Sequence, residues 1–539
     1  MASAQTVIPN AGQVLRDIPQ APLVPTPQTD PSQQVDAAID SRSSKTARFA
    51  VKAIVLSGNK EVPTAPLQTL VEGAKGPAVS LEQLDAAARR ITAYYRRKGY
   101  AVARAYLPEQ DITAGTVTIA IVEGHIAGHV LNNRSSLSNE RVSKYLGDIQ
   151  DGDVVRSTRI ERGLLLLQDT PGISASHATL QPGASPGTSE LLIDVLPAAA
   201  IGGDVSLDNY GGRYVGEYRL SSDVSLANPL KIGDQLSATG LTSGKNLQYG
   251  RLAYQVPVGA DGLRVGVAYF DLHYKLGKEF AALDAHGTAR SATLYAGYPL
   301  IRSAAGNLSA TTSLEDKHLD DDVGATSTAS RKNIQVVGFA LSGLWQDGFS
   351  GGGVNRFNLA WTLGHLGIQP ASTRAIDAAS AQTQGEYSKL SYALSRQQRL
   401  ASETWLLASL TGQLSSKNLD SSEKFSLGGP TGVRAYPTDE ATGDSGYTAT
   451  LELRQLLRPG IQGALFYDMG SIETNKHPFD AKASNRRTLS GAGLGVNITM
   501  GKLEVRTSLA WRVSGGAPKS IPASAAKTPA LEVLASLAL

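Results

Sequence analysis

From residue 201 to residue 539, hydrophobic and polar residues alternate along the chain with a period of two. The alternation is clearest in 218–226, 447–454 and 502–511. In the last of these, one face is apolar and holds Leu503, Val505, Leu509 and Trp511. About 16 such segments follow one another without a convincing amphipathic helix, which predicts β-strands with one apolar and one charged face. An antiparallel membrane barrel, with lipid outside and water inside, has this pattern.

The predicted connections between these strands alternate in length. The short ones are 228–233, 346–352, 399–401, 458–460 and 500–501. The long ones are 275–287, 317–333, 366–384, 416–443, 471–488 and 512–529. Short turns at one end and long loops at the other are typical of an outer-membrane β-barrel. A barrel of 16 strands is wide enough for an aqueous channel, so we expect a plug inside it.

Residues 48–124 and 125–198 form two tandem units of a different kind. The first has predicted strands at 49–56, 100–107 and 116–122 and helices at 64–71 and 81–97. Its longer helix opens with a capping box of Ser80 and Gln83 and ends at Gly99. The second has predicted strands at 126–131, 173–180 and 191–196 and helices from Ser138 and at 157–168. Each β-α-α-β-β unit is predicted to be a small α+β domain.

Before these units, 7–18 predicts a short helix and 19–47 a linker. Val14 and Ile18 share one face of the helix, and Leu15 adjoins them. A helix this short is unstable alone in water. It is therefore the expected plug, because nothing else is available for it to bury against. The many prolines of the linker predict an extended, stiff chain.

Composition narrows the class of protein. The chain has no cysteine, which excludes disulfides, cysteine metal sites and thiol nucleophiles. A net charge of +3 gives no reason to expect a nucleic-acid partner. The 18% of charged residues, 55 glycines and 19 tyrosines fit an outer-membrane barrel. No intact signal peptide is present, and the small residues Ala2, Ser3 and Ala4 lead us to expect a mature or trimmed secretory chain.

This architecture resembles the B-component of bacterial two-partner secretion, the TpsB family within the BamA superfamily. The tandem units resemble POTRA domains, and the helix, linker and 16-stranded barrel complete the resemblance. The most specific matches are Asn-Ala-Gly-Gln-Val-Leu-Arg at 10–16, Asp-Asn-Tyr-Gly-Gly-Arg-Tyr at 208–214, Gly-Gly-Pro-Thr-Gly-Val-Arg-Ala-Tyr at 428–436 and Phe-Tyr-Asp-Met-Gly at 466–470. The last two resemble the family's sixth-loop motif and its partner motif on strand 13.

These two motifs place a cation and an anion where they can meet. Asp468 shares a strand face with Gln462, the face assigned to the lumen, and Arg434 lies in a glycine-rich loop that can bend sharply. We expect a charge-assisted pair between them, a loop–barrel lock. The remaining motif residues are Gly432, Val433, Ala435 and Tyr436 in the loop, and Phe466, Tyr467 and Gly470 on the strand. The alternative is an exposed loop arginine and an unpaired lumen aspartate.

Two positions depart from the family pattern. Ala435 stands where the family usually has glycine, which makes a positive φ costly there. Leu539 ends the chain where many outer-membrane barrels end in phenylalanine. The alternation of Leu531, Val533 and Leu537 still predicts a closing strand, which the barrel assembly machinery is expected to recognise during biogenesis.

The resemblance implies a translocase in the bacterial outer membrane with its POTRA domains in the periplasm. Besides membrane lipid, its expected partner is a large secreted exoprotein with an N-terminal secretion domain, captured unfolded. An extended client can add a strand to a sheet edge. The expected edge is Ala101, Val102, Ala103, Arg104, Ala105 and Tyr106, although for each residue taken singly a role in the core of the unit alone is favoured. The plug helix is expected to leave the lumen before the client passes, and no cofactor or metal is expected.

Other functions fit the sequence less well. An insertase of the BamA type usually has more POTRA domains and lacks the helix and linker, and a passive porin has no use for two periplasmic domains. An enzyme is disfavoured, because Gly348-x-Ser350-x-Gly352 precedes a predicted strand rather than the helix of a nucleophile elbow. The cargo stays open among an adhesin, a haemolysin, a haem-scavenging protein and a contact-dependent toxin.

Metal binding is also disfavoured. His125 and His129 lie on a predicted strand, where residues four apart are separated by about 13 Å. Five acids are assigned to a long loop, where a solvated surface is favoured over a cation site: Glu315, Asp316, Asp320, Asp321 and Asp322.

Overall fold

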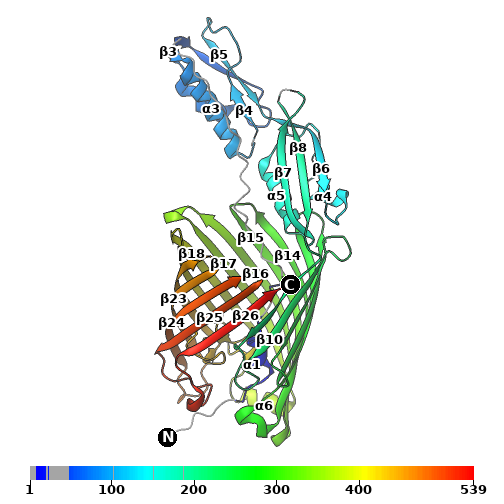
Figure 1. The fold of residues 1–539 in the computed structure, drawn as a ribbon, viewed down its shortest axis with the longest axis vertical. Helices are drawn as coiled ribbons and strands as arrows, with labels where there is room; N and C mark the ends of the chain where they lie inside the picture. Colours follow the sequence, from blue (N-terminus) through cyan, green and yellow to red (C-terminus); the bar gives the residue numbers. More distant parts are fainter. Residues whose placement is uncertain are drawn as a thin grey trace. The chain divides into compact units, whose positions relative to one another are not determined.

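The structure is a computed structural model (Figure 1), and it describes residues 8–19, 22–23, 48–100, 102–147, 149, 151–185 and 187–539. It divides into two compact units. In one, the N-terminal segment packs with residues 199–539, and the other lies within 29–198. Most of the predicted linker, 19–47, and the first residue of the predicted helix, 7–18, lie outside the described residues.

Sixteen antiparallel strands close into a barrel, as the alternating sequence predicts. In chain order they are β9 (Ile201–Asp208), β10 (Arg219–Ala227), β11 (Gln235–Thr242), β12 (Leu247–Val258), β13 (Leu263–Lys275), β14 (Ala285–Arg302), β15 (Gly306–Val323), β16 (Thr328–Asp347), β17 (Gly353–Gln369), β18 (Gly385–Ala401), β19 (Thr404–Ser415), β22 (Ser445–Arg458), β23 (Ile461–Glu473), β24 (Arg486–Met500), β25 (Leu503–Ser514) and β26 (Ala530–Ala538). β26 pairs with β9 and closes the ring.

Two of the predicted long loops are wrong, because strands run through them. The predicted loop 317–333 is a turn at 324–327, and the acids assigned to it lie in β15. Asp320 sits opposite Arg331 of β16, whose guanidinium also bonds to Asp322 at 2.9 Å. Cross-strand charge pairing of this kind stabilises a strand pair even where the acidic sequence is typical of a loop.

The predicted loop 366–384 is also shorter than expected. β17 continues to Gln369, and the helix α6 (Ala371–Ala378) follows it. The prediction that no helix follows residue 201 is therefore wrong at α6. Its side chains are not buried, which explains why no clear apolar stripe marks it.

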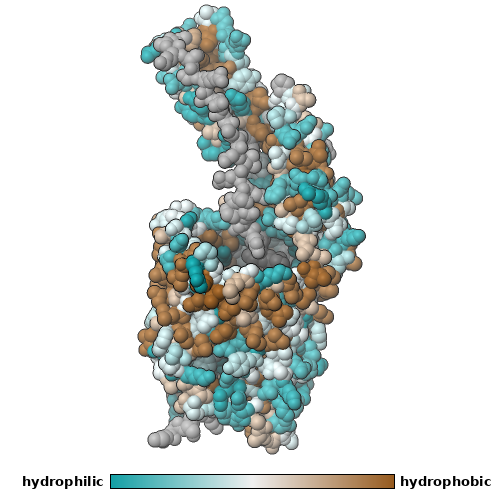
Figure 2. Space-filling view, in the orientation of Figure 1, coloured by the Kyte–Doolittle hydropathy of each residue, from teal (hydrophilic) through white to brown (hydrophobic). Residues whose placement is uncertain are grey.

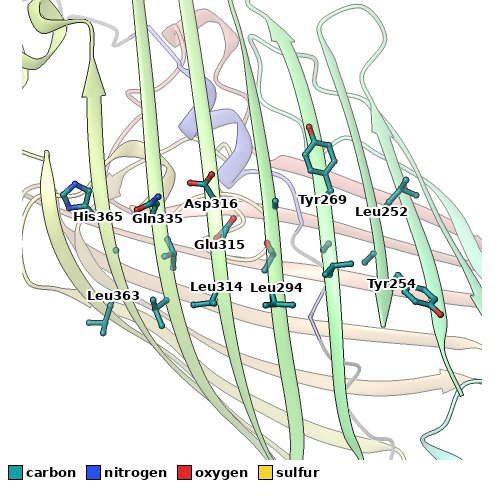
Figure 3. Close-up of a pocket in the computed structure, with 18 of the residues that line it drawn as sticks. Leu252, Tyr254, Tyr269, Leu294, Leu314, Glu315, Asp316, Gln335, Leu363 and His365 are labelled. Atoms are coloured by element: carbon teal, nitrogen blue, oxygen red, sulfur yellow. The ribbon is translucent and has the colours of Figure 1, made fainter. Parts of the chain in front are cut away.

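The barrel wall has an apolar outer face. Leu294 of β14, Leu314 of β15 and Leu363 of β17 are between 37% and 52% exposed. Figure 2 shows a band of hydrophobic side chains across the visible face of the barrel, with hydrophilic surface beside it. In Figure 3 these leucines lie next to a row of polar side chains, among them Asp316, Gln335 and His365, in a hollow of about 1040 Å³. The leucine row therefore marks one edge of the lipid-facing band.

Among the residues that the structure describes, no helix has the length and apolar character needed to cross a bilayer.

The first α+β unit contains β1 (Arg48–Val51), β2 (Ala53–Ser57), α2 (Thr64–Val71), η1 (Glu72–Ala74), β3 (Gly76–Ser80), α3 (Leu81–Arg97), β4 (Arg104–Tyr106) and β5 (Thr116–Val122). The sheet has the order β2-β5-β4, and β1 pairs separately with β3. Leu84, Ile91 and Tyr95 of α3 are buried against this sheet. The capping box of Ser80 and Gln83 is present. The predicted strand 100–107 is too long, because only β4 joins the ladder.

The second α+β unit contains β6 (His125–Asn133), α4 (Asn139–Tyr145), α5 (Ser157–Gln168), β7 (Ile173–Pro182) and β8 (Thr188–Pro197), with sheet order β6-β8-β7. It is joined to the first unit by polar contacts. Ser157 donates through both its backbone N and its Oγ to the Gly99 carbonyl, and Arg156 pairs with Glu61 at 2.8 Å.

A six-residue helix, α1 (Ala11–Arg16), lies inside the barrel unit. Asn10 caps its start: Asn10 Oδ1 accepts from the Gln13 backbone N, and the Asn10 backbone N donates to Gln13 Oε1. Val14, Leu15 and Ile18 are each less than 5% exposed and pack on inward-facing residues of the wall. The helix is short, and this burial provides the stability that its own backbone lacks.

Candidate functional site

A loop of residues 416–444 between β19 and β22, here called the lumen loop, folds back inside the barrel. It contains η5 (Ser421–Glu423) and a small hairpin of β20 (Phe425–Ser426) and β21 (Thr442–Gly443). Two glycines permit the bend at its tip. Gly429 has φ +92°, and a Cβ on Gly432 would lie 2.0 Å from the Leu427 carbonyl oxygen. The sequence Gly-Gly-Pro-Thr-Gly is therefore a requirement of the folded-back path.

The bend brings Arg434 onto Asp468 of β23. Arg434 Nε donates to Asp468 Oδ2 at 2.8 Å and Nη2 donates to Oδ1 at 2.9 Å, which is a bidentate pair. The Arg434 backbone N also donates to Asp468 Oδ2, at 3.2 Å. The guanidinium carbon lies 3.4 Å from the centre of the Phe466 ring. Asp468 is 1% exposed, so the pair is almost completely removed from water.

A third charged residue, Glu452 of β22, completes this site. Arg434 Nη1 donates to Glu452 Oε2 at 2.8 Å, and Arg454 donates to Oε1 of the same carboxylate at 2.7 Å. Burial alone would lower the pKa of Arg434, but its hydrogen bonds to Asp468 and Glu452 outweigh that effect and raise it. Arg434 therefore stays charged. Glu452 lies on the polar face of the predicted strand 447–454, but no pattern in the sequence identifies Arg434 as its partner.

The other motif residues build an apolar seat for this pair. Val433, Ala435 and Tyr436 are buried with Phe466 and Leu489. Ala435 does not have a positive φ, so the cost expected of a non-glycine residue does not arise. Instead, its methyl group meets a glycine of the wall, since a Cβ on Gly491 would lie 2.6 Å from Ala435 Cβ.

The strand motif divides between the two faces of the wall. Phe466 and Gly470 face the loop, and a Cβ on Gly470 would lie 2.8 Å from Leu427 Cδ2. Tyr467 is 41% exposed on the opposite face and does not take part in the lock. The alternation of β23 requires this division.

The base of the lumen loop is held by a second set of buried charges. Glu423 pairs with Lys317 at 3.0 Å and with Lys389 at 2.9 Å, and Asp420 pairs with Lys332 at 2.6 Å. Burial alone would raise the pKa of Glu423, but the two lysines outweigh it and lower that pKa. The three lysines project inward from β15, β16 and β18, where sequence reasoning did not assign them a role.

The helix α1 is seated between this base and the wall. Ser421 Oγ donates to Asn10 Oδ1 at 2.7 Å, and Arg16 Nη1 donates to the Ser421 carbonyl at 3.0 Å. On the wall, Asp321 of β15 accepts from the Ala11 backbone N at 2.6 Å. A Cβ on Gly12 would lie 2.4 Å from Ser421 Oγ, so the helix approaches the loop too closely for any residue larger than glycine.

The 208–214 motif lies where the barrel closes. Asp208 pairs with Arg219 at 2.9 Å, and both side chains are buried. Asn209 donates through Nδ2 to the Leu531 carbonyl and accepts from the Val533 backbone N, both at 2.8 Å. Its side chain thereby extends the ladder between β9 and β26. The C-terminal Leu539 bonds to Gly203 through its backbone N.

The predicted client-binding edge differs from the expectation in its side chains. Ala101 lies outside the described residues. Ala103 and Ala105 are buried in the core of the first unit, and Val102 packs on the core of the second. Arg104 and Tyr106 are exposed. Among the described strands β4 pairs with β5 alone, so its other edge is free, but the Ala105 N–H already donates to Thr92 Oγ1 at 3.0 Å.

The enzyme and metal patterns have no support in the geometry. Ser350 lies in the turn η4 (Phe349–Gly351), and β17 follows it, so the strand–turn–helix of a nucleophile elbow is not formed. His125 and His129 both lie in β6. Over the described part of the chain, no group of three or more His, Asp or Glu residues is arranged to hold a metal ion.

Comparison with known proteins identifies the family. Residues 187–498 match the family model described as haemolysin secretion/activation protein ShlB/FhaC/HecB. The chain belongs to this family. Residues 49–124 match the ShlB-type POTRA domain. The chain is therefore a B-component secretion transporter of the outer membrane, with its POTRA domains in the periplasm, and it acts with a secreted exoprotein partner. The family assignment favours this function over an insertase of the BamA type.

Individual relatives span almost the whole chain. The chain is 28% identical over 518 residues to the Heme/hemopexin transporter protein HuxB of Haemophilus influenzae. The aligned residues cover 93% of this chain and 91% of the relative. It is 24% identical to the outer membrane transporter CdiB of Dickeya dadantii, over 81% of this chain and 77% of the relative. The solved structure of CdiB from Escherichia coli has the same fold, with TM-score 0.74, 22% identity and coverage of 98% and 96%.

Proposed function

We propose that this transporter captures its exoprotein unfolded at the first POTRA domain and passes it through the barrel after α1 has left the lumen. The observation that carries the proposal is the occupancy of the lumen, which holds both α1 and the lumen loop. A client needs the space of at least one of them. No Gly-x-x-x-x-Gly-Lys-Ser/Thr motif occurs in the sequence, so we infer that folding of the client outside the cell gives the direction.

The seat of α1 supports its role as the removable plug. Burial of three large apolar side chains, Val14, Leu15 and Ile18, stabilises docking by roughly 5–9 kcal/mol before the entropy of ordering the segment is subtracted. The net free energy of docking that remains is within the range that binding of a client can offset. α1 is also tethered through the long proline-rich stretch 19–47, so it can leave the lumen without leaving the molecule.

The loop–barrel lock supports a different role. We propose that Arg434, Asp468 and Glu452 keep the tip of the lumen loop inside the barrel. A bidentate, buried pair holds one geometry, and the aromatic ring of Phe466 fixes the guanidinium from one side. A loop fixed in this way limits the width of the lumen and leaves α1 as the segment that exits.

The free backbone edge of β4 supports client capture at that strand. An added strand gains main-chain hydrogen bonds with little demand on sequence, which suits an unfolded client. The Ala105 N–H is engaged by Thr92, so the client has to displace that hydroxyl. Thr92→Val is isosteric and frees the N–H, and we expect it to raise the affinity of the first POTRA domain for its client by about fivefold, the equivalent of about 1 kcal/mol. An unchanged or lower affinity in a folded Thr92→Val variant contradicts capture at this edge.

The names of the relatives point to a first cargo to test. HuxB is named for haem and hemopexin, so we propose an exoprotein that binds haem or a haem carrier and has an N-terminal secretion domain. The experiment is co-expression of that exoprotein with the full transporter, scored by its appearance in the medium. Removal of residues 48–124 should abolish secretion while the barrel still assembles with outer-membrane lipid and the barrel assembly machinery. Secretion that persists without these residues contradicts POTRA capture.

A further inference from the structure

The C-terminal end of α1 meets the lumen loop at a group of charged side chains. Arg16 Nη2 lies 3.6 Å from Asp17 Oδ1 and 3.9 Å from Asp439 Oδ1. One guanidinium nitrogen of Arg16 therefore lies close to both the Asp17 and the Asp439 carboxyl groups. Arg219 Nη1 donates to the Asp17 carbonyl at 3.2 Å, while its Nε pairs with Asp208 at 2.9 Å. Five charged residues from α1, the lumen loop, β9 and β10 therefore come together.

Two ionised carboxylates beside the same guanidinium repel each other, and they can bond to each other only when one carries a proton, because an ionised carboxylate only accepts. The side chains of Asp17 and Asp439 are 12% and 26% exposed, so little water is available to separate their charges. Burial and the adjoining Asp439 carboxyl raise the pKa of Asp17 well above its ordinary value, against the opposing effect of Arg16 and Arg219.

The charge balance of the group also favours a proton on one of its carboxyls. Fully ionised, it holds the cations Arg16 and Arg219 against three aspartates at 17, 208 and 439. One added proton balances the group. Two other titratable side chains adjoin it. Tyr214 donates its hydroxyl hydrogen to the Ser520 carbonyl, and Glu440 is directed to Arg487 and to the backbone N–H groups of 519 and 520. Neither supplies the missing positive charge.

We propose that Asp439 is a positioning residue for α1, which shares one proton with Asp17 while the helix is seated, and that loss of this proton loosens the seat. This inference rests on the proposed function of α1 as the plug. It adds a residue of the lumen loop to the machinery that holds the plug, and it makes docking sensitive to pH.

The direction of the pH effect follows from linkage. When α1 leaves, Asp17 moves away from Asp439 and from the buried site, and the pKa of Asp17 returns towards its ordinary value. A carboxyl whose pKa is higher in the docked state stabilises docking below its undocked pKa, and this stabilisation is lost as the pH rises through the docked value. α1 is therefore released more readily at higher pH. One shared proton gives at most about a tenfold change in the ratio of released to docked helix per pH unit.

The test is the conductance of the full-length protein in planar bilayers between about pH 5 and about pH 8. We expect the open fraction of the unmodified protein to rise with pH. Asp439→Asn and Asp17→Asn each allow an amide to donate to the remaining carboxylate without a titrating proton, so each variant should remain closed and lose the pH dependence. Asp480→Asn is the matched control, because Asp480 is exposed and bonds only locally to the Lys482 backbone N, and it should keep the profile of the unmodified protein.

A second measurement reports the position of α1 directly. The chain has no cysteine, so spin labels at Ile8→Cys and Phe479→Cys give one clean distance across the barrel unit. This distance should shift with pH in the unmodified background and not in Asp439→Asn. A flat profile in the unmodified protein, or a retained slope in both asparagine variants, overturns the inference.

Removal of residues 8–19 separates this inference from the proposed function. If that deletion opens the channel at every pH while the open fraction of the asparagine variants still depends on pH, α1 is the plug and only the proposal of a shared proton is wrong. If the deletion leaves conductance unchanged, α1 is not the plug and the proposed function fails with it. Each variant is accepted for these measurements when its barrel shows the heat-dependent electrophoretic mobility of the unmodified protein.

Discussion

The two segments that fill the lumen are held there by different forces. α1 is seated by apolar side chains on an apolar part of the wall. Its polar contacts with the wall and the lumen loop are hydrogen bonds at its two ends and one long ion pair, Arg16 with Asp439 at 3.9 Å. The lumen loop is held by buried ion pairs at its base and at its tip: Glu423 with Lys317 and Lys389, Asp420 with Lys332, and Arg434 with Asp468 and Glu452.

This difference separates a removable part from a fixed one. Apolar contact is non-directional, so a helix can slide off its seat and find other apolar contacts elsewhere. Breaking a buried ion pair leaves a charge without a partner, which costs about 3–5 kcal/mol. We therefore expect α1 to exchange between docked and released states while the lumen loop stays in place. Four predictions test this comparison.

The largest effect is expected when α1 is removed. Deletion of residues 8–19 should convert a mostly closed channel into a persistently open one in planar bilayers, because the whole docking energy is lost. The barrel should still assemble, since sixteen strands close without the helix. As a control, Ile8→Ala, at a residue 38% exposed, should leave conductance unchanged. A closed channel after the deletion would show that the lumen loop alone seals the barrel.

Charge reversal in the lock should have the next largest effect. Arg434→Asp or Asp468→Arg alone should reduce secretion strongly, because each leaves like charges buried at a cost of about 3–5 kcal/mol. The double reversal should recover part of the loss. Recovery is incomplete because the new aspartate at 434 faces Glu452, and the further change Glu452→Gln should improve it.

The readout for these reversals is the amount of exoprotein in the medium relative to the amount of folded transporter. A double reversal that secretes no better than either single reversal contradicts pairing as the role of these residues. Tyr467→Phe is a suitable control, since Tyr467 belongs to the same strand motif but is exposed on the opposite face.

A smaller effect is expected from trimming the seat of α1. Leu15→Ala removes a side chain that is 4% exposed, and we expect docking to weaken by about 2–4 kcal/mol. The open fraction should rise by at least about tenfold, while the lumen loop keeps its protection from protease. If Leu15→Ala also exposes the loop to protease, the two segments release together and the comparison fails.

The smallest effect is expected from pH, and it has a different outcome for each segment. The ion pairs lower the pKa of Glu423, so its stabilisation of the lumen loop is present above the ordinary glutamate pKa and is lost only in stronger acid. Between about pH 8 and about pH 5 the loop should stay fixed while α1 docks more tightly. A spin label at Thr431→Cys, on the exposed tip of the loop, should show unchanged mobility over this range. Mobility that increases towards pH 5 would contradict fixed anchoring.

The limits of sequence reasoning appear at particular residues. Alternation assigned Asp468 to the lumen and Tyr467 to the lipid side, because the side-chain period of a strand is two regardless of what surrounds it. Alternation did not predict the strand that contains Asp320 and Asp322, because a run of acidic residues suggests a loop. That strand is stabilised by Arg331 on the neighbouring strand. Such partners are fixed by register across the sheet and are not visible along one segment.

The predicted edge strand failed for a related reason. Residues 100–107 have a suitable composition for a strand, but only Arg104–Tyr106 pair with β5. Val102 instead packs on the core of the second α+β unit and lies close to Gly124. Contacts between domains thus shortened a strand that local propensity favoured.

The sequence by itself determined the barrel, the two α+β units, the short N-terminal helix and the two halves of the lock. Each depends on a local periodicity of residues or on a motif that can be recognised within one segment of the sequence. Only the tertiary structure decided that Glu452 joins Arg434, that three lysines hold the base of the lumen loop, and that Asp17 meets Asp439. These contacts join residues far apart in the chain, and their strength comes from burial, which a single segment cannot reveal.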